Sequence, residues 1–132
     1  MLENQLKKTR LLELSTRTGI FMFILLGLLA AFNNFFTNIF QIQSKFYLIS
    51  LIYFGTAYYL YTFKQKNELQ IHNSYKLLAV EYTFLSIAGM VLAGDLFGLI
   101  SLNYFASLLH MLISLIFTYL GFILDEHELE LD

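Results

Sequence analysis

Long apolar runs alternate with short polar segments along the chain. The runs cover about residues 15–35, 46–63, 77–94 and 101–124. A helix of about 20 apolar residues is long enough to cross the hydrocarbon core of a bilayer. The pattern therefore predicts an all-α fold: a polytopic integral membrane protein in which residues 1–132 form a single domain, a bundle of four transmembrane helices.

The polar segments between and beyond these runs are short. Residues 1–14 mix leucines with basic residues, which predicts either an amphipathic helix at the membrane interface or a solvated basic flank. Residues 64–76 are interpreted as a polar central loop, and residues 96–103 as a turn or an interfacial piece before the fourth helix. The acidic tail, residues 125–132, is expected to be a solvated end or otherwise a docking peptide.

Basic residues are distributed unevenly between the two sides of the predicted membrane. Four precede the uncharged part of the first run, three lie in the central loop and one follows the first run: Lys7, Lys8, Arg10 and Arg17, then Lys64, Lys66 and Lys76, and finally Lys45. Because cytoplasmic loops are enriched in lysine and arginine, both termini and the central loop are predicted to be cytoplasmic. The expected location is the plasma (inner) membrane, with multiple crossings.

Composition narrows the chemistry that the chain can perform. Hydrophobic residues make up 58% of the chain and charged residues 14%, too apolar for a soluble domain of this size. The absence of cysteine excludes disulfides and thiolate metal sites. No nucleophilic triad, paired intramembrane histidines or phosphate-binding glycine loop occurs, so neither an enzyme nor a cofactor is expected. A nucleic-acid partner is not expected either.

The clearest pattern inside the apolar runs is a polar stripe on the predicted fourth helix. Its members are spaced by three or four residues: Asn103, Ser107, His110, Ser114, Thr118 and Gly121. At 100° per residue they fall within an arc of about 80°. The stripe is expected either to contact other helices or to line the water path of a pore, and helix contact is the preferred interpretation.

Other residues in the spans point to packing or to ion binding. Glu81, Ala88 and Asp95 recur every seven residues and are predicted to share an interior face of the third helix. Glu81 and Asp95 are candidate proton or cation sites, although hydrogen bonds from tyrosines would give Glu81 a structural role. Two pairs of small residues at a spacing of four, Gly27 with Ala31 and Gly89 with Ala93, predict close helix packing.

Two functional hypotheses follow. In the first, the chain is a non-catalytic membrane component that self-associates or binds a larger membrane-protein partner within the lipid bilayer. In the second, it forms an oligomeric ion- or proton-conducting pore or a small transporter, lined by the polar face of the fourth helix. The chain differs from the small multidrug transporters, whose essential glutamate lies in the first span, because no charge occurs between Thr18 and Ser44.

Overall fold

The computed structural model describes residues 2–39, 46–91, 95–96, 100–101 and 104–124. Within these residues there are four α-helices: α1 (Leu2–Ile39), α2 (Phe46–Tyr61), α3 (Glu68–Val91) and α4 (Tyr104–Thr118). A short 3₁₀ helix, η1 (Thr62–Gln65), leads from α2 toward α3, and a π-helical segment, η2 (Tyr119–Ile123), continues α4. The predicted all-α fold class is confirmed at this level.

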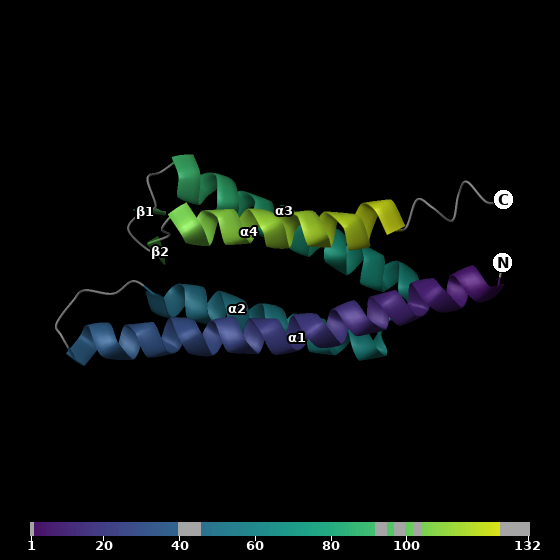
Figure 1. Ribbon diagram of the computed structural model, residues 1–132, viewed down its shortest axis with the longest axis horizontal. Helices are drawn as coiled ribbons and strands as arrows, with labels where there is room; N and C mark the ends of the chain where they lie inside the picture. Colours follow the sequence, from purple (N-terminus) through teal and green to yellow (C-terminus); the bar gives the residue numbers. More distant parts are fainter. Residues whose placement is uncertain (1, 40–45, 92–94, 97–99, 102–103, 125–132) are drawn as a thin grey trace.

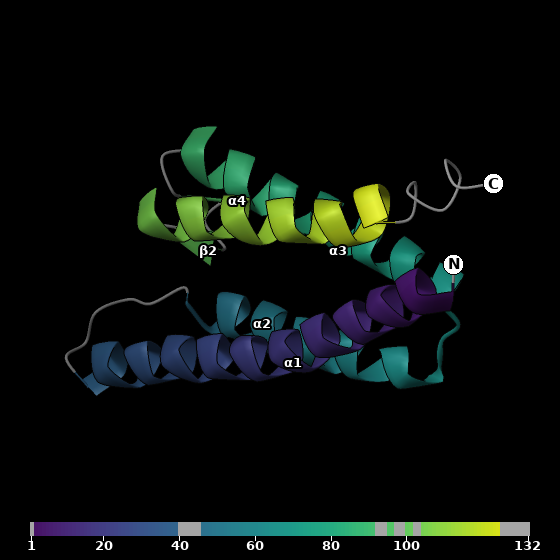
Figure 2. The ribbon, with the colours of Figure 1, turned by 45° about the vertical axis from the view of Figure 1, so that its right-hand side comes forward.

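The helices form two antiparallel pairs. α1 lies along α2, and α3 lies along α4, and these are the two most extensive helix contacts. α3 runs obliquely, so its first turns lie near the α1–α2 pair and its later turns lie beside α4 (Figures 1 and 2). The N-terminal part of α1, η1 and the start of α3 therefore meet at one end of the molecule.

α1 joins two segments that the sequence analysis separated. It is a single helix of 38 residues, so the N-terminal segment and the first apolar run are continuous. No proline interrupts the chain, and the Lys7–Glu3 and Arg17–Glu13 ion pairs connect successive turns of the polar half. At 1.5 Å per residue α1 is about 57 Å long, well beyond the roughly 30 Å of a bilayer core.

α3 begins earlier than the third apolar run. Residues 64–76 were expected to be a polar loop, yet they comprise the end of η1 and the first turns of α3. A capping box explains this start: the Gln70 backbone N–H donates to the Asn67 side chain (2.9 Å), and the Gln70 side chain accepts from the Asn67 N–H (3.1 Å). Polar residues can thus form a helix because its first turn is capped.

A small antiparallel pairing precedes α4. Asp95–Leu96 (β1) pairs with Ile100–Ser101 (β2), with Asp95 opposite Ser101 and Leu96 opposite Ile100. Apart from Asp95, these residues belong to the segment that was expected to be a turn or an interfacial piece. α4 accordingly begins at Tyr104 rather than at residue 101.

Two of the described helices are long and apolar enough to cross a membrane, by length and composition. They are the Leu2–Phe32 part of α1 and the Tyr104–Ile123 stretch of α4 and η2. The outer surface carries large apolar side chains, including Phe21 (67% exposed), Val91 (74%) and Phe105 (74%). Extensive exposed apolar surface is unusual for a soluble monomer.

Aromatic rings from all four helices form the centre of the core. Phe23 of α1 stacks on Phe117 of α4, with ring centroids 5.9 Å apart, and lies 5.4 Å from the ring of Tyr82 of α3. Tyr53 of α2 completes the group, 6.2 Å from Phe23. The two helix pairs are therefore joined by ring contacts at mid-length, beside the polar residues of α4.

Candidate functional site

The polar stripe of α4 faces the inside of the molecule. Ser107 and His110 are 0% exposed and Ser114 is 6% exposed, whereas leucines and phenylalanines cover the outer side of α4. Gly121 is also buried, and the Thr118 hydroxyl donates to the Ser114 carbonyl of its own helix (2.8 Å). Asn103 lies outside the described residues. The buried members of the stripe are thus covered by helices of the same chain.

Hydroxyl groups connect α4 to α3 along this contact. Ser86 donates to the Ser107 carbonyl oxygen (3.0 Å), and Ser114 donates to the Ala79 carbonyl oxygen (3.2 Å). The hydroxyls of Thr83 and Ser114 also form a hydrogen bond with each other. Small hydroxylated side chains let the two backbones approach and bond to each other across the contact.

His110 lies at the centre of the buried polar layer. Its Nε2 is 2.7 Å from the Tyr53 hydroxyl, and its ring centroid is 5.7 Å from that of Tyr53 and 5.6 Å from that of Tyr82. The Tyr82 hydroxyl in turn shares a hydrogen bond with Thr56 of α2 (2.9 Å). This layer therefore contains side chains of α2, α3 and α4.

Two atoms of this layer have no hydrogen-bond partner among the described residues. They are the Ser107 hydroxyl and Nδ1 of His110, which come from residues one turn apart on α4. Burying an unpaired polar group costs about 1–3 kcal/mol, so native cores contain few of them. A water molecule between the two groups is one arrangement that would pair both.

The small residues predicted for packing have different surroundings. A Cβ atom at Gly27 would lie 2.8 Å from the Phe54 ring, and the Gly27 carbonyl accepts a hydrogen bond from Ser50 (2.8 Å), so α1 and α2 touch there. Ala31 is half-buried and Gly89 is buried. Ala93 lies outside the described residues.

Glu81 does not lie on an interior face. Its side chain is exposed, whereas Ala88, seven residues later, is buried. The oblique course of α3 changes which side of the helix is covered along its length. Glu81 has no hydrogen bond or ion pair in the part of the chain that the structure describes. The side chain of Asp95 lies outside the described residues, so no contact between the two acids is assigned.

Apart from Thr83, the exposed side of α3 around Glu81 is apolar. We call it the Glu81 face, and it contains Leu77 (60% exposed), Val80 (64%), Glu81, Phe84 (59%) and Ile87 (56%). These residues recur at spacings of three and four, so they line one side of the helix. A single carboxylate thus interrupts a continuous apolar surface.

A second polar cluster at the start of α3 was missed by the sequence analysis. Nδ1 of the buried His72 donates to the Leu120 carbonyl (2.7 Å), and the Tyr75 hydroxyl shares a hydrogen bond with Thr16 (2.7 Å). Burial raises the pKa of Tyr75 to about 12, although the hydrogen bond with Thr16 acts in the opposite direction. The Asn67 capping box and the helical spacing of Ile71, Tyr75 and Leu78 are the signals that indicate a helix here.

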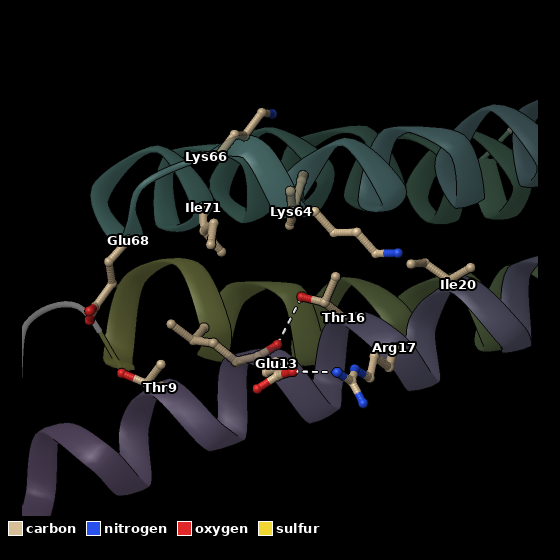
Figure 3. A pocket seen from close by; sticks show the side chains of 11 residues that line it. Thr9, Glu13, Thr16, Arg17, Ile20, Lys64, Lys66, Glu68 and Ile71 are labelled. Carbon is tan, nitrogen blue, oxygen red and sulfur yellow. Dashed lines mark hydrogen bonds and ion pairs between the residues drawn. The ribbon is translucent and has the colours of Figure 1, made fainter.

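An open pocket lies beside this cluster, between α1, η1 and the start of α3. We call it the interfacial pocket, and its volume is about 460 Å³. Figure 3 shows Glu13 and Arg17 side by side on its α1 wall, while the Lys64 side chain extends toward Ile20 and Lys66 points away. Its lining residues are Thr9, Leu12, Glu13, Thr16, Arg17, Ile20, Phe63, Lys64, Lys66, Glu68 and Ile71.

Comparison with known proteins identifies no family for the chain. No family model, curated protein or solved structure matches the chain. The function is accordingly inferred from the chain's own residues.

Proposed function

We propose that the chain is a four-span protein of the plasma (inner) membrane, with both termini cytoplasmic, that acts as a non-catalytic component and associates with a second copy of itself. The length and composition of α1 and α4 support the membrane location. The basic residues of η1, of the start of α3 and of the N-terminal half of α1 gather at one end of the molecule, which supports the orientation.

The observation that carries self-association is Glu81. Its carboxyl group lies on the apolar Glu81 face without a partner in the described chain. A charged side chain facing hydrocarbon costs about 2.5–3.5 kcal/mol even on the mildest scales, and such residues usually face protein or water. A neighbouring chain that supplies a hydrogen-bond donor would remove this cost.

The second copy offers a donor at the matching depth. Tyr58 of α2 is 71% exposed. The hydrogen bond between Thr56 and Tyr82 aligns α2 with α3, so Tyr58 and Glu81 lie at depths that agree to within about 3 Å along the bundle. In a two-fold dimer each Glu81 carboxyl would accept a hydrogen bond from the partner's Tyr58 hydroxyl.

The burial of the α4 stripe supports this choice of surface. Ser107, His110 and Ser114 are already covered by α2 and α3 of the same chain. The stripe would therefore stabilise the fold, and association would use the outer side of α3. A larger membrane protein as the partner is the alternative occupant of the Glu81 face.

A dimerisation measurement tests the proposal. The full chain is labelled with donor or acceptor fluorophores at single cysteines, which is practical because the chain has no cysteine of its own. Energy transfer is then measured in lipid nanodiscs and vesicles as the protein-to-lipid ratio rises. Interhelical hydrogen bonds in membranes contribute about 0.6–2 kcal/mol. Each variant removes both copies of this bond from the two-fold dimer, so Glu81→Leu and Tyr58→Phe should each weaken dimerisation by roughly 8- to 800-fold.

The double variant and a matched control sharpen this test. The double variant Glu81→Leu/Tyr58→Phe should dimerise no more weakly than the weaker of the two single variants, because both substitutions remove the same bond. Tyr61→Phe, another exposed tyrosine on α2, should leave dimerisation unchanged. A chain that stays monomeric at all ratios, or a Glu81→Leu variant that dimerises normally, contradicts the proposal.

A conducting path is the second candidate. The observation that favours it is the pair of unpartnered buried groups on Ser107 and His110, next to the bond between His110 and Tyr53. Water held there would link titratable and hydroxyl groups into a chain through the core. Such a path would run within one copy, along the inner side of α4, and not between copies.

A further inference from the structure

We propose that the interfacial pocket binds the phosphate group of an anionic phospholipid, whose acyl chains then lie along α1. This proposal rests on the membrane location proposed above but not on self-association. The pocket volume of about 460 Å³ falls within the range of small-ligand sites, about 300–1,000 Å³. Basic pockets at the cytoplasmic ends of membrane helices are suited to anionic head groups.

The position of the pocket fits a lipid head group. It opens between the polar half of α1 and η1, where the apolar run of α2 ends and basic residues begin. Leu12, Ile20 and Phe63 line its apolar part. Beyond Ile20, α1 continues with Phe21 (67% exposed) and Ile24 (42% exposed). An apolar track therefore leads from the pocket into the expected hydrocarbon layer.

Two cations in the pocket are available to a phosphate. The Lys64 side chain extends along the gap between η1 and α1 (Figure 3), and its Nζ lies 4.5 Å from the centroid of the Tyr61 ring. Arg17 pairs with Glu13 on an exposed surface, with side chains 74% and 58% exposed. Exposed pairs of this kind are weak, so the guanidinium can exchange Glu13 for a phosphate.

The remaining charged groups of the pocket are already paired. Glu68 forms an ion pair with Lys8 (2.8 Å), whose side chain is only 9% exposed. Lys66 donates to Ser74 (2.8 Å) and lies over the rings of Tyr59 and Phe63. Glu68 is therefore neutralised, and the ligand role is assigned to Arg17 and Lys64.

Native mass spectrometry of the full chain in detergent tests this assignment. The chain is incubated with phosphatidylglycerol or with phosphatidylcholine, and the bound lipids are counted. We expect phosphatidylglycerol to be retained over phosphatidylcholine. The double variant Arg17→Gln/Lys64→Gln should retain at least about fivefold less phosphatidylglycerol, because charge-assisted contacts to the phosphate are removed.

A control variant with the same change in charge distinguishes lipid binding in the pocket from general electrostatic attraction of anionic lipid to the chain. Lys7→Gln/Arg10→Gln removes two exposed cations of α1 that do not line the pocket. Its retention should change by about twofold or less, because screened surface charges contribute little. Equal losses in both double variants overturn the proposal. The conservative variant Arg17→Lys/Lys64→Arg should keep retention, and its failure to do so also contradicts the assignment.

The source of the phosphate is tested in the same experiment. Inorganic phosphate at millimolar concentration should not displace phosphatidylglycerol, because the ion lacks the acyl chains that contact α1. Displacement by inorganic phosphate would assign the pocket to a free anion and overturn the lipid assignment. Dimerisation measured on the same variants distinguishes a failed pocket from failed self-association, since Arg17 and Lys64 lie on α1 and η1, whereas the Glu81 face lies on α3.

Discussion

Buried hydroxyl groups in the contact between α3 and α4 differ in whether they have a hydrogen-bond partner. Ser86 and Ser114 donate across the contact, whereas the Ser107 hydroxyl has no partner among the described residues. The spacing of the stripe predicts which residues lie together on α4. It does not predict that Tyr53 and Tyr82 would be the neighbours of His110, because these contacts depend on how three helices are aligned.

Ser107→Ala separates the structural interpretation from the conducting one. If the hydroxyl is unpaired, its removal should leave the free energy of unfolding unchanged or raise it slightly, whereas Ser86→Ala should lower it by about 0.6 kcal/mol by losing one interhelical bond. Reversible unfolding in mixed micelles measures both values.

The conducting candidate predicts a different result for the same variant. If water pairs Ser107 with His110, Ser107→Ala destabilises the fold by about 1 kcal/mol or more. Proton flux into liposomes would then be present in the native chain and lost in His110→Ala. A native chain without flux, together with a neutral Ser107→Ala, excludes this candidate.

Gly121 and Gly27 lie where helices of this chain approach each other closely. At Gly121 of η2 a Cβ atom would lie 2.7 Å from the Lys76 backbone nitrogen, and at Gly27 of α1 it would lie 2.8 Å from the Phe54 side chain. Small-residue spacing in the sequence predicted a close approach at Gly27. Gly121 was recognised only as a member of the polar stripe, because its neighbour, the backbone of α3, is decided by the helix crossing.

Alanine substitutions at two glycines test these approaches. Gly121→Ala should lower the free energy of unfolding by about 1–3 kcal/mol, since backbone atoms must move to admit the methyl group. Gly55→Ala is the matched control: a Cβ atom at Gly55 would meet no other atom within 4 Å, so the substitution should be neutral or stabilising by up to about 1 kcal/mol. Equal effects at both sites would contradict the close contact between η2 and α3.

The proposed orientation of the whole chain places its basic end in the cytoplasm. The bias of basic residues predicts this orientation directly, because it is a property of the order of residues. In the fold, the same basic residues occupy the end at which α1, η1 and α3 meet, so charge and architecture agree.

Reporter fusions test this orientation. A reporter active only in the cytoplasm should be active when fused to either end of the chain. Replacing Lys64, Lys66 and Lys76 with glutamine should reduce activity at the C-terminal fusion, because the bias that retains the central loop is weakened. Opposite activities at the two ends would indicate an odd number of spans and contradict the four-span arrangement.

The linear order of apolar and polar residues was enough to predict helices, an apolar exterior and the inner stripe of α4, because each depends on local spacing. The partner of His110, the exposure of Glu81 and the interfacial pocket depend on contacts between segments far apart in the chain. The oblique course of α3 determines them. Because α3 begins near the α1–α2 pair and ends beside α4, it turns different sides inward along its length. For this reason Glu81 and Ala88, which share one predicted face, differ in exposure, and this difference cannot be derived from the order of residues alone.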